Sequence, residues 1–102
     1  MDVWHIFRRY KLNIDQDRIF DPIRKKWVHL TPEEIVRQKT IKFLIQRLKV
    51  PADKIIVERS LGTLGIPGSR RRIDIGILDA DGALLAIIEC KAEINIYDCS
   101  PY

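Results

Sequence analysis

Two apolar segments joined by a short polar stretch constrain the fold of this chain most strongly. Residues 73–78 and 84–91 are rich in isoleucine, leucine and alanine, and residues 79–82 between them read Asp-Ala-Asp-Gly. Apolar, partly β-branched segments on either side of such a turn predict a β-hairpin. Three charged residues nevertheless interrupt these strands: Asp74, Glu89 and Lys91. Because a charge in an apolar strand is costly unless it is paired, we expect the three to act together.

Strand geometry brings these charges to one face. Side chains alternate between the two faces of a strand, so Glu89 and Lys91 point the same way. The loop can close in two registers, one pairing Leu78 with Ala83 and the other pairing Asp79 with Leu84. In either register Asp74 shares the face of Glu89, directly opposite it or one pair diagonal. Two carboxylates and an ammonium group are therefore predicted to converge.

A divalent metal ion is the natural partner for two converging carboxylates, which would otherwise repel each other. Mg²⁺ (or Mn²⁺) is usually held by one or two carboxylates together with water and phosphate oxygens. Such an ion activates water and neutralises charge on a phosphoryl oxygen, while Lys91 would position the nucleophilic water or stabilise the negative charge that develops. A structural Asp/Glu/Lys network on a solvated sheet face is the alternative that the spacing leaves open.

The segments before the long hairpin predict a smaller hairpin and one helix. Residues 18–20 and 27–30 look like short strands around an Asp-Pro turn. Thr31 is a suitable N-cap and Glu34 would complete a capping box, so a helix is expected from Pro32 to about Lys49. Residues 54–58 then predict a strand. This order indicates an α+β fold, with the helix packed on a mainly antiparallel three-stranded sheet.

Charge and composition narrow the class of partner. The formal net charge is +4, and the excess is clustered. Such clusters favour an acidic polymer as partner, although solvated turns would look the same. The residues expected to contact nucleic acid are Arg24, Lys25, Lys26, Arg70, Arg71 and Arg72. The sequence has no apolar run that could span a membrane, no secretory signal and no disulfide framework, so a cytoplasmic location is expected.

Three further polar residues are weaker candidates for the site. Glu34 and Gln38 border the apolar arc of the predicted helix, and Glu58 ends a predicted strand. Each has an ordinary explanation, since Glu34 serves the capping box and an acid at a strand end is common. Neither histidine has the neighbours of a zinc site, and no phosphate-binding glycine loop or Ser/His or Cys/His nucleophile motif is present.

These residues carry a resemblance to a known family. Asp74 followed by Glu89-Cys90-Lys91 resembles the D…(D/E)xK signature of the PD-(D/E)xK nuclease superfamily. Residues 18–92 also resemble the N-terminal nuclease domain of type I restriction enzyme R subunits, in particular small stand-alone bacterial proteins that carry it. The segments that carry this likeness are residues 19–28, 30–38, 57–58, 71–75 and 88–92.

The resemblance implies a Mg²⁺-dependent DNA endonuclease with a restriction-endonuclease-like core. Asp74 and Glu89 would be the metal ligands and Lys91 the catalytic lysine. Glu34 or Glu58 becomes a candidate extra acid, and Gln38 a candidate site neighbour. The partners would be DNA and other subunits of a restriction system.

The chain also departs from the family pattern. It ends eleven residues after Lys91, where the family continues with a helix and a strand, and it contains no helicase or translocase region. We therefore expect an extension over residues 1–17, an incomplete nuclease-like domain over residues 18–92 and a tail over residues 93–102. The missing pieces would expose a sheet edge that favours a homo-oligomer. A catalytically inactive remnant that binds DNA or a partner chain is the alternative.

Overall fold

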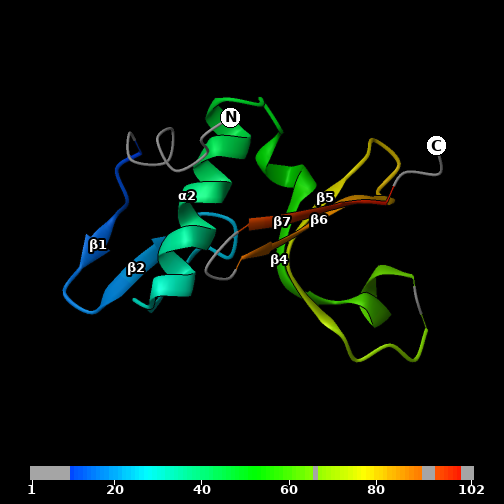
Figure 1. Cartoon of the computed structure of the whole chain (residues 1–102), viewed down its shortest axis with the longest axis horizontal. Helices are drawn as coiled ribbons and strands as arrows, with labels where there is room; N and C mark the ends of the chain where they lie inside the picture. Colours follow the sequence, from blue (N-terminus) through cyan, green and yellow to red (C-terminus); the bar gives the residue numbers. More distant parts are fainter. Residues whose placement is uncertain (1–9, 66, 91–93, 100–102) are drawn as a thin grey trace. The chain divides into compact units, whose positions relative to one another are not determined.

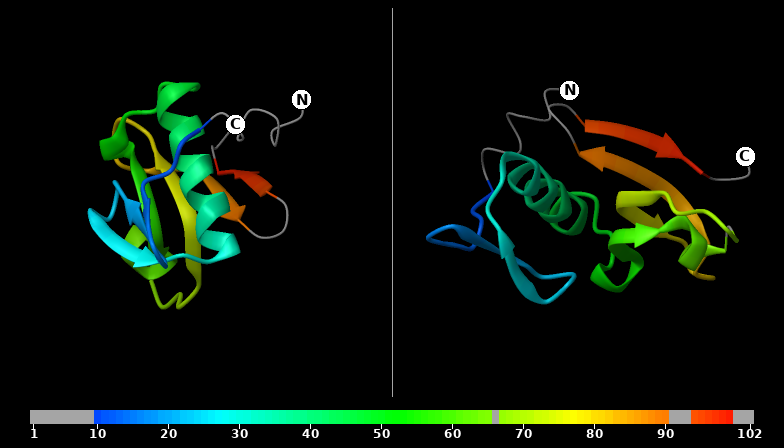
Figure 2. Two further views of the ribbon diagram at one scale, coloured as in Figure 1. Left: turned by 90° about the vertical axis from the view of Figure 1, so that its left-hand side faces the viewer. Right: turned by 90° about the horizontal axis from the view of Figure 1, so that it is seen from below.

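The fold is that of a computed structural model, in which residues 10–65, 67–90 and 94–99 are described. The chain divides into two compact units, Met1–Pro51 and Ala52–Tyr102, and each is described by itself (Figures 1 and 2). Within the described residues, the first unit contains a small sheet and one α-helix, and the second contains a larger sheet. All strand pairs are antiparallel, so the α+β class predicted from the sequence is confirmed.

A three-stranded sheet opens the first unit. Its strands are β1 (Ile14–Asp15), β2 (Arg18–Asp21) and β3 (Lys26–His29), in that order. The predicted hairpin is β2–β3, and Asp21 closes its turn by accepting hydrogen bonds from the backbone N–H groups of Ile23 and Arg24. These bonds are why an aspartate suits the start of the turn. The short β1 is an addition to the predicted hairpin.

The helix α2 (Pro32–Gln46) follows the hairpin and lies against β2. Thr31 is its N-cap, as predicted, because its hydroxyl accepts the Glu34 N–H at 3.0 Å. The helix ends three residues before the predicted Lys49. Its final turn is closed by bonds from the N–H groups of Arg47 and Leu48 to the Phe43 carbonyl, and Lys49 then takes a positive φ of 59°. The left-handed turn at Lys49 stops the helix before proline can.

The second unit is a four-stranded antiparallel meander in which each strand pairs with the next (Figures 1 and 2). A 3-10 turn, η1 (Ala52–Lys54), leads into β4 (Ile55–Ser60), and another, η2 (Leu61–Leu64), follows that strand. The remaining strands are β5 (Arg72–Leu78), β6 (Leu84–Cys90) and β7 (Ile94–Asp98). The predicted sheet had three strands, and β7 adds a fourth from the segment predicted as a tail.

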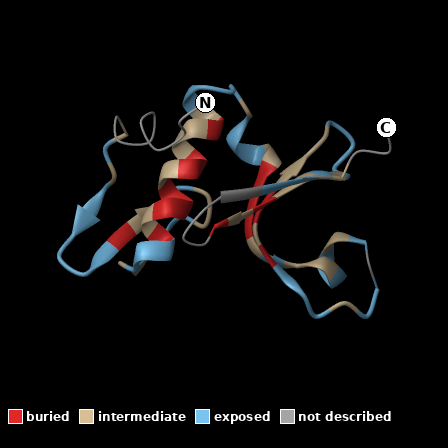
Figure 3. Cartoon of the chain, viewed as in Figure 1, coloured by how far each residue is buried: buried red, intermediate tan, exposed pale blue. Residues whose placement is uncertain are grey.

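Burial is concentrated in the middle of the large sheet and along one side of α2 (Figure 3). The buried apolar residues of the sheet are Ile55, Ile56, Val57, Ile73, Ile75, Ile88 and Cys90. In α2, by contrast, four of the seven buried residues are polar or charged: Glu34, Arg37, Gln38 and Thr40. Burying charge requires partners, and Arg37 and Gln38 both donate hydrogen bonds to the Glu34 carboxylate. No helix in the described part of the chain is long and apolar enough to cross a membrane.

Candidate functional site

The pairing of β5 with β6 decides where Asp74 and Glu89 lie. The ladder pairs Ile75 with Ile88, Gly76 with Ile87 and Ile77 with Ala86. This is the register that continues to Asp79 opposite Leu84, although a shift between Ile77 and Leu78 changes the pairing next to the turn. Continued by one residue in the other direction, the same register puts Asp74 directly opposite Glu89.

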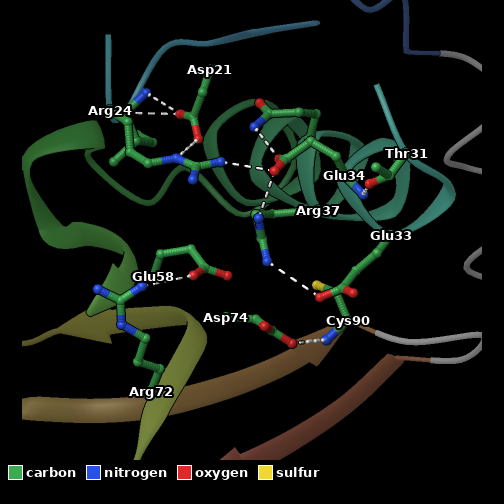
Figure 4. Close-up of polar contacts among 12 residues, drawn as sticks. Asp21, Arg24, Thr31, Glu33, Glu34, Arg37, Glu58, Arg72, Asp74 and Cys90 are labelled. Atoms are coloured by element: carbon green, nitrogen blue, oxygen red, sulfur yellow. Dashed lines mark hydrogen bonds and ion pairs between the residues drawn. The ribbon is translucent and has the colours of Figure 1, made fainter. Parts of the chain in front are cut away.

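The two strands stop pairing with each other at that position. The last β5–β6 pair is Ile75 with Ile88, yet β5 continues its pairing with β4 as far as Arg72. Likewise β6 continues its pairing with β7 as far as Cys90. The Cys90 N–H donates to Oδ2 of Asp74 at 2.7 Å (Figure 4). The Asp74 carboxylate thus takes the place of a backbone carbonyl, which is the usual acceptor of such an N–H group in an unbroken ladder.

A guanidinium group already lies close to Glu89. The Glu89 side chain is 15% exposed, and Nη2 of Arg71 lies 3.7 Å from its Oε1. Arg71 itself is 64% exposed and immediately precedes β5. Glu89 thus has a guanidinium group as an ion-pair partner at a distance longer than a direct hydrogen bond.

Glu58 lies on the other side of β5. It stands in β4 between two residues that pair with Ile75 and Ile73, so the register puts it across from Asp74. Its φ is +56°, a left-handed conformation that is unusual for a residue other than glycine. Its Oε2 lies 3.6 Å from Nη1 of Arg72 (Figure 4). Filled in between the β4–β5 pairs and extended by one position past the β5–β6 pairs, the two registers therefore put Glu58, Asp74 and Glu89 in one row across β4, β5 and β6.

The donor chemistry at Asp74 and Glu89 fits Mg²⁺. This ion is commonly held by only one or two carboxylates, with water and phosphate oxygens completing its octahedron. The described residues form no group of three or more Asp, Glu, His or Cys side chains that could hold a metal ion. Glu58 as an additional acid therefore remains a prediction. Lys91 lies outside the described residues, so the structure places two of the three predicted catalytic residues.

Glu34 and Gln38 belong to a buried network inside the first unit. Oε1 of Glu34 accepts hydrogen bonds from Arg24 at 2.9 Å and from Arg37 at 2.6 Å (Figure 4). The Gln38 amide donates to Oε2 at 3.0 Å. Glu34 thus joins the turn of the hairpin to the helix. Within the described residues, its carboxylate bonds to these side chains and does not close the capping box.

Asp21 anchors the other end of this network. It is fully buried, and its Oδ2 accepts a hydrogen bond from Nε of Arg24 at 2.6 Å. Burial by itself raises the pKa of Asp21, but the hydrogen bonds from Arg24 and from the Ile23 backbone outweigh it, so the pKa lies below its usual value. For Arg24, burial lowers the pKa, and the bonds to Asp21 and Glu34 more than reverse this. Both groups are held in their charged forms.

The comparison with protein families decides what this domain is. A family model described as Type I restriction enzyme R protein N terminus (HSDR_N) matches residues 32–98. The chain belongs to this family. The match runs from α2 to β7 and includes all three predicted catalytic positions, Asp74, Glu89 and Lys91. Comparisons with curated proteins and with solved structures found no match.

The basic residues of this R-protein N-terminal domain differ in exposure. Lys25, Lys26 and the triplet at residues 70–72 are exposed. Arg24 is only 19% exposed in its side chain and is engaged by Asp21 and Glu34. Assignment of any of them to DNA contact remains a prediction.

Two features of the domain were not predicted from the sequence. One is the buried network of Asp21, Arg24 and Arg37, for which the spacing of Glu34 and Arg37 at i and i+3 on one helix was an available signal. The other is the pairing of Arg71 with Glu89. The sequence gives no local signal for that contact, because the two residues are brought together only by the β5–β6 register.

Proposed function

We propose that this chain is a metal-dependent DNA nuclease module that hydrolyses phosphodiester bonds with Asp74, Glu89 and Lys91. The observation that carries the proposal is the hydrogen bond from the Cys90 N–H to Asp74 at the point where β5 and β6 stop pairing, where the extended register puts Asp74 opposite Glu89. Family membership supports it, because the match to the restriction R-protein domain includes this pair.

Each residue has a distinct task in this proposal. Asp74 and Glu89 would each give a carboxylate oxygen to Mg²⁺, which supplies an activated water molecule and charge neutralisation at the phosphoryl oxygen. The Cys90 N–H fixes the direction of the Asp74 carboxylate before the metal binds. Lys91 follows Cys90 and would stabilise the charge that develops on the phosphate.

DNA would be held mainly through its backbone. The exposed triplet at residues 70–72 leads directly into β5, the strand that carries Asp74. Lys25 and Lys26 supply a second exposed basic segment. Arginine and lysine contacts to phosphates give affinity without reading the base sequence. Target choice would therefore come from other subunits of a restriction system. The proposed location of the protein is the cytoplasm.

Cleavage of plasmid DNA in the presence of Mg²⁺ or Mn²⁺ tests the proposal. The wild-type chain should nick or linearise the plasmid, and chelation of the metal should stop it. Lys91→Ala should abolish cleavage while the circular dichroism spectrum is unchanged, and Lys54→Ala is the matched control that should retain cleavage. Equal cleavage by Lys91→Ala and wild type would overturn the assignment.

A second candidate function is association with another chain. β7 is an edge strand of the large sheet, and its Ile96 and Tyr97 are 68% and 50% exposed, while Leu85 on β6 is 40% exposed. An apolar edge strand is suited to pairing with a second sheet. Under this candidate, sedimentation at several concentrations should reveal a dimer that Ile96→Lys dissociates. A dimer that cleaves no DNA would favour this candidate over the nuclease.

A further inference from the structure

Arg71, which immediately precedes β5, and Arg72, its first residue, differ in kind from the arginines of the first unit. Arg24 and Arg37 are mostly buried and contact acids at 2.6 Å. Arg71 and Arg72 are 64% and 70% exposed and lie 3.7 and 3.6 Å from their acids. Charge-assisted hydrogen bonds between arginine and carboxylate are typically about 2.7–2.9 Å long. The first pair is therefore locked into the fold, and the second pair is loosely held and easily displaced.

The loosely held arginines lie on both sides of Asp74. Arg71 is paired with Glu89 on β6, and Arg72 is paired with Glu58 on β4. These two acids are the neighbours of Asp74 across the sheet. The guanidinium groups thus supply positive charge to the carboxylates among which the proposed metal would bind.

We propose that Arg71 is an exchangeable counterion of Glu89 that a divalent cation displaces and that then contacts a DNA phosphate. The inference rests on the proposed nuclease function and adds a positioning residue to it. A metal on Glu89 takes over the neutralisation of that carboxylate and repels the guanidinium. Because the released side chain is exposed and starts beside the metal site, the phosphate that it meets is one close to the bond being cleaved.

This exchange couples the two binding events. In the metal-free protein Arg71 competes with the cation for Glu89, so it lowers the affinity for metal. In the metal-bound protein Arg71 is available to DNA, so metal raises the affinity for DNA. By linkage, DNA must raise the affinity for metal by the same factor.

The first experiment measures Mn²⁺ affinity without DNA, by calorimetry, in about 0.15 M salt, where charges are screened beyond about 8 Å. Arg71→Gln should bind Mn²⁺ about two- to fivefold more tightly than wild type, which is the scale of a partly exposed ion pair. Arg70→Gln is the matched control. It removes the same charge from the neighbouring position, and Arg70 has no ion pair in the described part of the chain. Equal affinities for the two variants would overturn the inference.

The second experiment measures DNA binding by fluorescence anisotropy in a Lys91→Ala background, which prevents cleavage. With Mn²⁺, Arg71→Gln should reduce the slope of log affinity against log salt by about one, the value for one lost phosphate contact. Without Mn²⁺ the change should be smaller. Arg70→Gln should have the same effect with and without the metal. An Arg71→Gln effect that is independent of Mn²⁺ would refute the exchange.

The outcomes separate this inference from the proposed function. If the wild-type chain binds Mn²⁺ and cleaves DNA while Arg71→Gln behaves like Arg70→Gln, the exchange is wrong and the nuclease assignment stands. If the wild-type chain binds no Mn²⁺, both are wrong. Because Arg71 is exposed, its substitution should leave the fold intact, and circular dichroism checks this.

Discussion

Asp74 accepts a hydrogen bond from the backbone N–H of Cys90 at 2.7 Å, where β5 and β6 stop pairing. Cys90 is fully buried and stands between Glu89 and Lys91 in the chain. One contact therefore ties the first acid of the proposed site to the segment that carries the other two groups. Asp74 consequently has a structural task as well as its proposed chemical one, and the two tasks can be separated.

Substitution of Asp74 by asparagine or alanine should separate them. Asparagine keeps an oxygen that can accept the Cys90 N–H but removes the charge, so Asp74→Asn should lose Mn²⁺ binding and cleavage. Its free energy of unfolding should fall by only about 1 kcal/mol, the difference between a charged and a neutral acceptor. Alanine removes the acceptor of a buried N–H, so Asp74→Ala should cost about 1–3 kcal/mol. Urea denaturation measures both, and equal stability of the two variants would contradict the structural task.

The buried network predicts that Glu34 matters for stability. Glu34→Gln would remove the charge that faces Arg24 and Arg37 in a mostly buried setting. We expect a loss of roughly 3 kcal/mol, the low end for breaking a buried ion pair, because Arg24 keeps Asp21 and Arg37 keeps Glu33. Glu33→Gln is the control. Its carboxylate is 54% exposed and 3.4 Å from Arg37, so its loss should cost under about 1 kcal/mol.

The same pair of variants tests whether Glu34 also belongs to the proposed site. If Glu34→Gln unfolds at lower urea but cleaves DNA normally while folded, its role is confined to the network. Normal stability with lost cleavage would reverse that conclusion and make Glu34 the additional acid that the family resemblance implies.

Acid should weaken the first unit through Asp21. Its pKa in the folded chain lies below the usual value, because the hydrogen bonds from Arg24 and Ile23 outweigh the opposing effect of burial. An aspartate in the unfolded chain has a pKa of about 3.9. The stabilisation from Asp21 is therefore complete above about pH 4 and is lost as the pH falls through the folded pKa.

Urea denaturation of Asp21→Asn between pH 7 and pH 2 measures this. The variant should be less stable than wild type at neutral pH, and the difference should shrink on acidification. Asp53→Asn, at an exposed aspartate, is the control and should track wild type at every pH. A gap between Asp21→Asn and wild type that stays constant with pH would contradict the prediction.

Local signals in the sequence were sufficient for most of the fold. The Asp-Pro turn, the Thr31 N-cap and the long hairpin each depend on residues close in sequence, and all three are present. The end of α2 was predicted less accurately, because Lys49 adopts a positive φ although such a position is usually marked by glycine. The fourth strand was not predicted, because the short alternation of Ile94 and Ile96 in the sequence does not show that this segment pairs with β6.

The sequence predicted which face of the sheet carries the candidate site, but not the register that pairs its two strands. Strand parity alone placed Asp74 on the face of Glu89, but two registers remained open until the ladder and its shift near Leu78 decided between them. The partly buried bond between Arg24 and Glu34 joins residues ten positions apart, one in the turn and one in the helix. No periodic pattern encodes such a contact, because it depends on how the hairpin packs on the helix.

The left-handed conformation of Glu58 could not be read from its residue type, and its energetic cost can be measured. A non-glycine residue with positive φ costs roughly 1–2 kcal/mol relative to glycine. Glu58→Gly should therefore be more stable than Glu58→Ala by about 1 kcal/mol. At an ordinary strand position the order is reversed, since glycine there is about 0.5–1 kcal/mol worse than alanine. The neighbouring Arg59, exposed and paired with Ile73, provides that comparison through Arg59→Gly and Arg59→Ala. Thermal and urea denaturation of the four variants should give opposite orders at the two positions, and the same order at both would show that Glu58 carries no backbone strain.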